Sequence, residues 1–353
     1  MSSDALSVGR YLRGASYTIV IGIVMFVAGL PACDGAQSDH QASRKSGQYA
    51  TGSGRNVSGE MVHDGLKRNY LLYIPDSLKQ ESDTPLVLVF HGGFGSGTRI
   101  ARRVGMNAIA DKEKFIVAYP DGVDRHWNDG RSTTASGADD VSFILALIDH
   151  IKEMYKIDDT RIYATGLSNG GYLTTRLACE SSDVIAAFAP VISTMPVPLN
   201  VNCKPGRPVP VMMINGKDDP LVPWDGGQLS SGKRMGGKGG EVISVPDTIS
   251  FWRMYNNCTD DYKEKTLPDK DPDDGTRVKQ KKYTECEAGA EVTLLTVIGG
   301  GHTWPGAPER PRMKKRTGNT SYDIDASEVI WEFFERHTLI QHQTSDVPRN
   351  YKQ

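Results

Sequence analysis

The feature that most constrains the fold is a run of glycines around one serine. Residues 166–171 read Gly-Leu-Ser-Asn-Gly-Gly and separate a β-branched and aromatic run at 161–165 from a helical stretch at 172–178. Glycines allow the sharp, strained turn that lifts a serine hydroxyl off the end of a strand. Backbone N–H groups at the start of the next helix can stabilise negative charge there. The pattern predicts that Ser168 is a nucleophile; a glycine-rich turn with a solvent-facing serine is the alternative.

Apolar runs of strand length alternate with helical patterns along most of the chain. Continuous apolar runs suit parallel strands that are buried on both faces. The alternation predicts an α/β fold, with a mostly parallel central sheet and helices on both faces, in one domain at 58–342. We expect the glycine- and lysine-rich segment 226–240 and the charged segment 260–282 to be loops. The expected strands are 68–75, 85–90, 115–120, 161–165, 185–190, 209–214 and 292–298, and the expected helices are 141–151, 172–178, 245–255 and 327–337.

The N-terminus has the pattern of an export signal. Two arginines precede an apolar run at 17–30, which is short for a spanning helix and suits a signal peptide. Ala32 and Cys33 resemble a bacterial lipobox, in which the cysteine becomes the lipidated first residue of the mature protein. A plain signal peptide with a chance cysteine, or an uncleaved anchor, is the alternative. We therefore expect a signal peptide at 1–32, a flexible tether at 33–57, a polar tail at 343–353 and a lipid anchor on Cys33.

This pattern predicts a cell-envelope lipoprotein, periplasmic or on the cell surface, with an extracellular form as the alternative. The chain has five cysteines, and four remain once Cys33 is set apart. An even number in an exported chain favours disulfides, and four cysteines permit three pairings. We favour Cys179–Cys203 and Cys258–Cys286, because each pair closes a short local loop.

The charge and motif content narrow the classes of ligand. The formal net charge is −2, which gives no electrostatic basis for binding nucleic acid. The chain contains no Cys-X-X-Cys motif, so we expect no zinc site. An acidic run at 269–275 lacks the glycine and the glutamate of a calcium loop, so we expect no metal there. An uncharged substrate fits this chain best.

A second glycine-rich segment directly follows the apolar run 85–90. Residues 91–95 read His-Gly-Gly-Phe-Gly, and a glycine there lets the backbone approach a substrate oxygen. We expect the N–H of Gly93 to be one oxyanion donor, with Phe94 as the competing choice, and the N–H of Asn169 to be the other. We expect His91 to brace the loop.

Two later loops supply an acid and a base. Residues 215–224 read Asn-Gly-Lys-Asp-Asp-Pro-Leu-Val-Pro-Trp, and both Asp218 and Asp219 lie where a triad acid belongs. The residues alone do not separate the two aspartates, and a turn capped by either one is the alternative. Gly-Gly-Gly-His at 299–302 frees His302 to reach the nucleophile. We expect His302 to take the serine proton while the aspartate holds its tautomer.

Together these motifs resemble those of the poly(3-hydroxybutyrate) depolymerase-like esterases, which have the α/β-hydrolase fold and lie near the bacterial feruloyl and acetylxylan esterases. The resemblance implies that Asp219 is the acid, that the two favoured disulfides form, and that Trp127, Asn128 and Trp304 line the acyl pocket. Tyr172 departs from the family, which often has methionine there. The matching stretches are Leu-Val-Phe-His-Gly-Gly at 88–93, Trp-Asn-Asp-Gly-Arg at 127–131, Asp-Asp-Val-Ser-Phe-Ile at 139–144, and those at 163–171, 219–224 and 300–306.

The resemblance also implies an activity. It points to a serine carboxylic-ester hydrolase that acts through an acyl-enzyme and needs no cofactor or metal. Expected substrates are short-chain esters, hydroxycinnamoyl esters of the feruloyl or acetylxylan type, or hydroxyalkanoate esters of the polyhydroxybutyrate type, as small molecules or oligomers. An acyltransferase on the same scaffold, or a catalytically silent surface-tethered binding lipoprotein, is the alternative.

Overall fold

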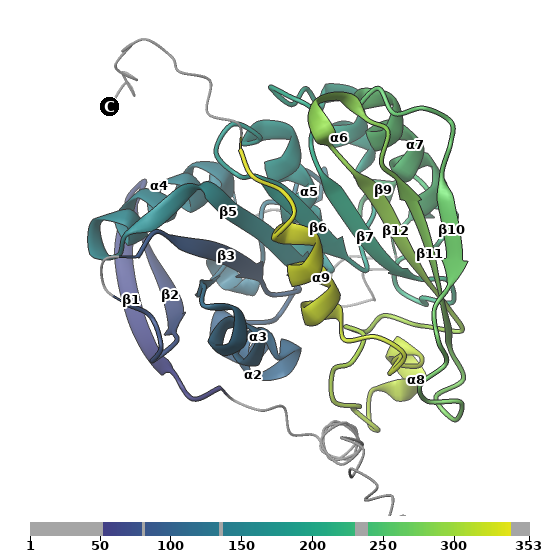
Figure 1. Cartoon of the computed structure of the whole chain (residues 1–353), viewed down its shortest axis with the longest axis horizontal. Helices are drawn as coiled ribbons and strands as arrows, with labels where there is room; N and C mark the ends of the chain where they lie inside the picture. The colour runs from purple at the N-terminus through teal and green to yellow at the C-terminus, as the bar shows by residue number, and fades with distance from the viewer. Residues whose placement is uncertain (1–51, 80–81, 134–136, 230–238, 340–353) are drawn as a thin grey trace, which may run out of the picture.

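One large sheet forms the centre of the molecule (Figure 1). The structure is a computed structural model that describes residues 52–79, 82–133, 137–229 and 239–339. The strand order is β1-β2-β4-β3-β5-β6-β7-β12-β11-β10. The central strands are all parallel: β4 (Ile116–Pro120), β3 (Thr84–Phe90), β5 (Ile157–Leu167), β6 (Ala187–Val191), β7 (Val211–Gly216) and β12 (Val292–Ile298).

Antiparallel strands close both edges of the sheet. On one edge β1 (Arg55–His63) pairs with β2 (Leu66–Ile74), which pairs with β4. On the other edge β11 (Arg277–Tyr283) pairs with β12 and with β10 (Lys263–Thr266). All four residues of β10 are exposed and two are lysines, and such charge discourages further strands from adding to a sheet edge. β8 (Gly227–Gln228) and β9 (Glu241–Val242) form a separate small sheet.

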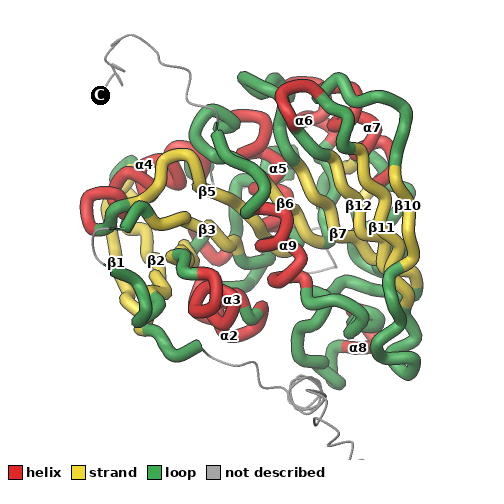
Figure 2. The backbone as a smooth tube through the Cα atoms, viewed as in Figure 1, coloured by secondary structure: helices red, strands yellow, loops and turns green. Residues whose placement is uncertain are grey.

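Helices cover both faces of the sheet, as Figure 2 shows. The side chains of β3 explain the arrangement: Leu86, Leu88 and Phe90 pack on one side, whereas Val87 and Val89 pack on the other. The first core includes residues of α4 (Asp140–Met154), α5 (Asn169–Glu180), α6 (Val197–Asn202) and α7 (Val245–Tyr255). The second includes residues of α2 (Gly97–Val104), α3 (Met106–Glu113) and α9 (Ala326–Phe334), while α8 (Lys314–Thr317) has no buried residue.

The expected parallel sheet and its covering helices are confirmed, and every strand and helix expected from apolar patterning is present. The segment 260–282 is not a loop as expected, because β10 and most of β11 lie within it. Arginine and lysine side chains on this edge hide the strand pattern, since only Val278 and Tyr283 of β11 are buried. β1 begins at Arg55, so the last residues of the expected tether belong to the sheet. Helices α2, α3, α6 and α8 were not expected.

Both disulfides favoured from loop length are present. Cys179 in α5 is bonded to Cys203, and Cys258 is bonded to Cys286. Such bonds are typical of proteins exported to oxidising compartments. No helix in the described ranges is both long enough and apolar enough to cross a membrane. The expected signal peptide, most of the tether, Cys33 and the polar tail lie outside the described residues.

Candidate active site

Ser168 stands on a strained turn between the central strand and the helix that follows it. β5 ends at Leu167, α5 begins at Asn169, and Ser168 has φ 56° and ψ −114°. A positive φ is uncommon for a residue other than glycine, and such strain clusters at functional sites. Gly166 and Gly170 make the turn sterically feasible, because neither has a side chain. A Cβ on Gly166 would lie 2.4 Å from the carbonyl oxygen of Gly170.

His302 joins the serine to an acid through its two ring nitrogens. Its Nε2 lies 3.0 Å from Oγ of Ser168, and its Nδ1 lies 2.7 Å from Oδ2 of Asp219. A carboxylate only accepts, so Nδ1 carries the proton and Nε2 presents a lone pair to the serine hydroxyl. The arrangement can therefore remove the serine proton and store it on the imidazole.

The two adjacent aspartates have different surroundings. The side chain of Asp219 is only 2% exposed, and its Oδ1 accepts the N–H groups of Leu221 (2.7 Å) and Val222 (2.9 Å). These bonds leave Oδ2 directed at His302. Asp218 is exposed, and its N–H donates to the carbonyl of Gly300. The geometry therefore favours Asp219 over Asp218 as the partner of His302.

The loop 91–95 lies against the serine. A Cβ on Gly92 would lie 3.5 Å from Cβ of Ser168. The N–H of Phe94 donates to the carbonyl of Arg125 at 2.9 Å, so it is not available to a substrate. Within the described residues the N–H of Gly93 has no bonded acceptor. The N–H of Asn169, as the first residue of α5, lacks an intrahelical acceptor. These two donors can face one substrate oxygen.

His91 braces this loop, as expected. Its Nδ1 donates to the carbonyl of Gly92 at 2.8 Å, and its Nε2 accepts the N–H of Gly122 at 3.0 Å. Burial lowers the pKa of His91, which keeps the imidazole neutral and able to accept that bond. The indole N–H of Trp127 also donates to the carbonyl of His91.

The family resemblance implied that Trp127 and Trp304 line the acyl pocket, but the structure does not place either residue at the protein surface. Trp127 and Trp304 are both 0% exposed and belong to the two cores, so neither offers a surface to a substrate here. Asn128 is partly exposed, but its N–H donates to Asp140 and its Nδ2 to the carbonyl of Ala138. Trp127 and Asn128 thus brace the loop after β4, and the pocket-lining expectation is corrected for the two buried tryptophans.

The side chain of Asn169 is hydrogen-bonded to the loop that contains Trp127 and Asp129, which the sequence did not indicate. Its Oδ1 accepts the N–H of Trp127 at 2.9 Å, and its Nδ2 donates to the carbonyl of Trp127 and to Asp129. Asp129 is fully buried and also pairs with Arg131 at 2.6 Å. The Trp-Asn-Asp-Gly-Arg stretch therefore fixes the start of α5, which directly follows Ser168.

His126, in the same loop, also lies beside the site. A Cβ on Gly93 would lie 3.2 Å from its Nε2 and 3.9 Å from Cβ of Asn169. The sequence patterns did not identify His126 as a site residue. Its position one residue before Trp127, in a loop that follows a core strand, could have indicated it.

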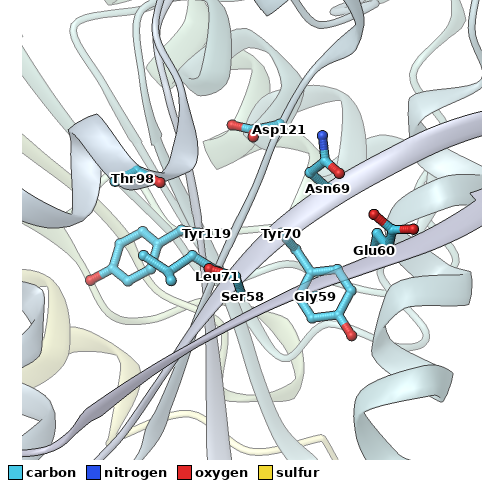
Figure 3. A pocket seen from close by; sticks show the side chains of 9 residues that line it. All are labelled: Ser58, Gly59, Glu60, Asn69, Tyr70, Leu71, Thr98, Tyr119 and Asp121. Atoms are coloured by element: carbon cyan, nitrogen blue, oxygen red, sulfur yellow. The ribbon is translucent and has the colours of Figure 1, made fainter.

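A separate polar hollow of about 340 Å³ lies beside α2 and the β1–β2 hairpin (Figure 3). Its two tyrosine hydroxyls are used inside the protein: Tyr119 donates to Asn107, and Tyr70 bonds to His150. None of Ser168, Asp219 and His302 lines it. Within the described ranges, no group of three or more His, Cys, Asp or Glu side chains is arranged to hold a metal ion.

Comparison with known proteins finds a family model and relatives that carry esterase names. The family model described as "Esterase PHB depolymerase" matches residues 68–196. The chain is 32% identical over 285 residues to a protein of Nocardia uniformis subsp. tsuyamanensis named as the esterase NocK, covering 78% of this chain and 81% of that protein. It is 30% identical over 243 residues to feruloyl esterase B of Piromyces equi, covering 67% of this chain but 42% of that protein.

One solved structure shows the shared fold. The acetyl xylan esterase of Aspergillus awamori superposes with a TM-score of 0.50 at 13% identity, over 79% of this chain and 99% of that chain. At this identity the likeness concerns the fold alone.

Proposed function

Because this chain belongs to the esterase family that includes polyhydroxybutyrate depolymerase-like and feruloyl esterases, we propose that Ser168, His302 and Asp219 are its catalytic triad. The chain is a carboxylic-ester hydrolase with the α/β-hydrolase fold. The observation that carries the residue assignment is the unbroken hydrogen-bond chain from Oγ of Ser168 through His302 to Asp219.

The proposed reaction has two halves. Nε2 of His302 takes the Ser168 proton as Oγ attacks the ester carbonyl, and Asp219 stabilises the imidazolium that forms. The N–H groups of Gly93 and Asn169 hold the oxyanion. His302 then gives its proton to the leaving alkoxide, which departs as the alcohol. Water, deprotonated by His302, attacks the acyl-enzyme and releases the acid together with free Ser168.

A covalent label and a chromogenic ester test this assignment together. Wild-type protein should hydrolyse p-nitrophenyl acetate, and an alkyl fluorophosphonate, which loses fluoride as Oγ bonds to phosphorus, should modify the peptide that contains Ser168 and no other. The Ser168→Ala variant should neither react with the phosphonate nor turn over the ester. An active Ser168→Ala variant, or a label on another residue, would refute the assignment. An inactive, unlabelled wild type would instead favour a silent binding lipoprotein.

The proposed substrates are short-chain, hydroxycinnamoyl or hydroxyalkanoate esters, because relatives carry feruloyl esterase names and the matching family is named for polyhydroxybutyrate depolymerase. The relatives described above are all named as esterases, so water is the acceptor we propose in place of a second alcohol. Methyl ferulate, a soluble hydroxybutyrate oligomer and a polyester film, compared at equal enzyme concentration, separate these classes. Clearing of the film without activity on either soluble ester would contradict this proposal.

We also propose that the exported protein is attached to a membrane through lipid on Cys33. The support is the sequence around Ala32 and Cys33 together with the two disulfides. A tether from this cysteine to β1 would hold the esterase domain in the cell envelope, in reach of soluble ester fragments.

A further inference from the structure

Two loops are joined beside the oxyanion donors. The loop 91–95 and the turn 122–126 share several hydrogen bonds: Phe94 N–H to the Arg125 carbonyl at 2.9 Å, Arg125 Nε to the Gly95 carbonyl at 3.3 Å, and Gly122 N–H to His91 at 3.0 Å. These bonds fix the position of the turn relative to Gly93. Any side chain that the turn directs toward Gly93 is therefore held next to the reacting carbonyl.

His126 is that side chain. Its Nδ1 lies 3.0 Å from the carbonyl oxygen of Asp124, which only accepts, so Nδ1 carries the proton. In the neutral ring Nε2 is then an acceptor with a lone pair, and it has no hydrogen-bond partner among the residues that the structure describes. The space above Gly93 that a Cβ would fill is 3.2 Å from this nitrogen. An unused acceptor thus stands beside the oxyanion hole.

Phe94 holds the imidazole in this orientation. The two rings meet edge to face, with centroids 4.4 Å apart and planes at 84°. Phe94 is 55% exposed and has φ 61°, as do few residues with bulky side chains, and Asp124 and Arg125 also have positive φ. An exposed aromatic ring kept in a strained conformation at a catalytic loop suggests a functional constraint. Together Phe94 and His126 form a partly exposed wall on the oxyanion side of the site.

We propose that His126 is a specificity-determining residue whose Nε2 accepts a hydrogen bond from a substrate hydroxyl close to the ester carbonyl. This inference rests on the proposed function, because it concerns the same site. Such a hydroxyl can be on the acyl chain, as in a 3-hydroxyacyl ester, or on the alcohol, as in a glycol or sugar ester. In both cases it lies within a few bonds of the carbonyl that Gly93 and Asn169 are proposed to hold.

The chemistry of the acceptor explains why a hydroxyl is favoured over an apolar group. A substrate O–H can donate to the Nε2 lone pair, whereas an apolar group cannot. A substrate with no donor leaves Nε2 desolvated and unpaired, which is unfavourable. The same hydrogen bond forms in the ground state and in the transition state, so its loss should raise KM more than it lowers kcat.

Three matched soluble esters test the proposal: ethyl butyrate without a hydroxyl, ethyl 3-hydroxybutyrate with one on the acyl side, and 2-hydroxyethyl butyrate with one on the alcohol side. The measured quantity is the ratio of kcat/KM for each hydroxylated ester to that for ethyl butyrate. His126→Asn keeps a donor near the Nδ1 position and removes the Nε2 acceptor. His126→Gln keeps an acceptor near the Nε2 position.

His126→Asn should lower the ratio for at least one hydroxylated ester about fivefold to tenfold, mainly through KM, and His126→Gln should restore part of it. The affected ester identifies the side of the substrate that carries the hydroxyl. His150→Asn is the matched control, because His150 is a partly exposed histidine on α4 that bonds to Tyr70, and its ratios should equal those of the wild type.

Unchanged ratios for both hydroxylated esters in His126→Asn would overturn the proposal. If kcat/KM then falls equally on all three esters, His126 only positions the loop, and if kcat/KM is also unchanged, His126 has no role in the reaction. Wild-type activity on the three esters separates this failure from failure of the proposed function, since a wild type inactive on all three would contradict the triad itself.

Discussion

The two adjacent aspartates at 218 and 219 differ in what they can do for His302, and a pair of substitutions measures that difference. Asp219→Asn removes the acceptor that fixes the imidazole tautomer and should lower kcat by roughly 10⁴-fold. Asp218→Asn changes an exposed side chain and should alter kcat by less than about threefold, because surface changes of this kind have small effects. Steady-state kinetics on p-nitrophenyl acetate gives both values. A larger loss from Asp218→Asn would reverse the assignment of the acid.

Asn169 should matter through its side chain as well as its backbone. In Asn169→Ala the buried N–H of Trp127 loses its acceptor, so we expect the free energy of unfolding to fall by about 1–3 kcal/mol. The start of α5 should also shift enough to lower kcat by about tenfold to a hundredfold. Urea unfolding and ester kinetics measure the two effects. Asn202→Ala is the control, since Asn202 is exposed on α6 and should change neither.

The junction of β3, β5 and α5 depends on the absence of a side chain at Gly170. A Cβ there would lie 2.4 Å from the carbonyl oxygen of Phe90, which is backbone and cannot move aside. Gly170→Ala should therefore destabilise the fold by about 1–3 kcal/mol and lower activity through displacement of Ser168. Gly206→Ala is matched to it, because the nearest atom to its Cβ would be 3.7 Å away. Equal melting temperatures for the two variants would contradict the steric argument.

The disulfide Cys258–Cys286 connects the end of α7 to the end of β11 at the sheet edge. It joins residues 28 apart in sequence, so removing it should cost roughly 3 kcal/mol of unfolding free energy. We expect the double variant Cys258→Ser and Cys286→Ser to retain the proposed triad and to melt at lower temperature. Non-reducing peptide mapping of the exported protein should find this pair and Cys179–Cys203. A cross-linked pair such as Cys203–Cys258 would argue against both the structure and the loop-length reasoning.

For the whole protein, the proposed lipid anchor predicts where the enzyme is found. Cys33→Ser should release the esterase from the membrane fraction or block its processing, because the thioether that would carry the lipid cannot form. Fractionation with mass analysis of the N-terminal peptide measures this. The catalytic domain should keep its activity in either fraction, since β1 begins only at Arg55. A wild-type mature protein found in the soluble fraction, without lipid, would refute the anchor.

Local sequence by itself determines the strands and helices and the order along the chain of the candidate catalytic residues. Continuous apolar runs such as 85–90 specify strands buried on both faces, because each alternate side chain must find a core. Glycines around Ser168 and before His302 mark the loops that need unusual backbone conformations, and those requirements are local. Loop length alone was enough to favour the observed disulfides, since short loops close with the least loss of entropy.

Tertiary structure decided the properties that depend on distant segments. Asp218 and Asp219 have equal chemistry in the sequence, and the position of His302, 83 residues from Asp219, is the physical difference between them. The tryptophans at 127 and 304 looked like pocket walls, yet long-range packing buries both, because burial depends on which elements meet above a side chain. The lysine-rich edge strands lacked an apolar signal, because backbone hydrogen bonds pair β11 with β12 and β10 with β11. His126 gained its place beside Gly93 in the same way, through hydrogen bonds between loops that are about thirty residues apart.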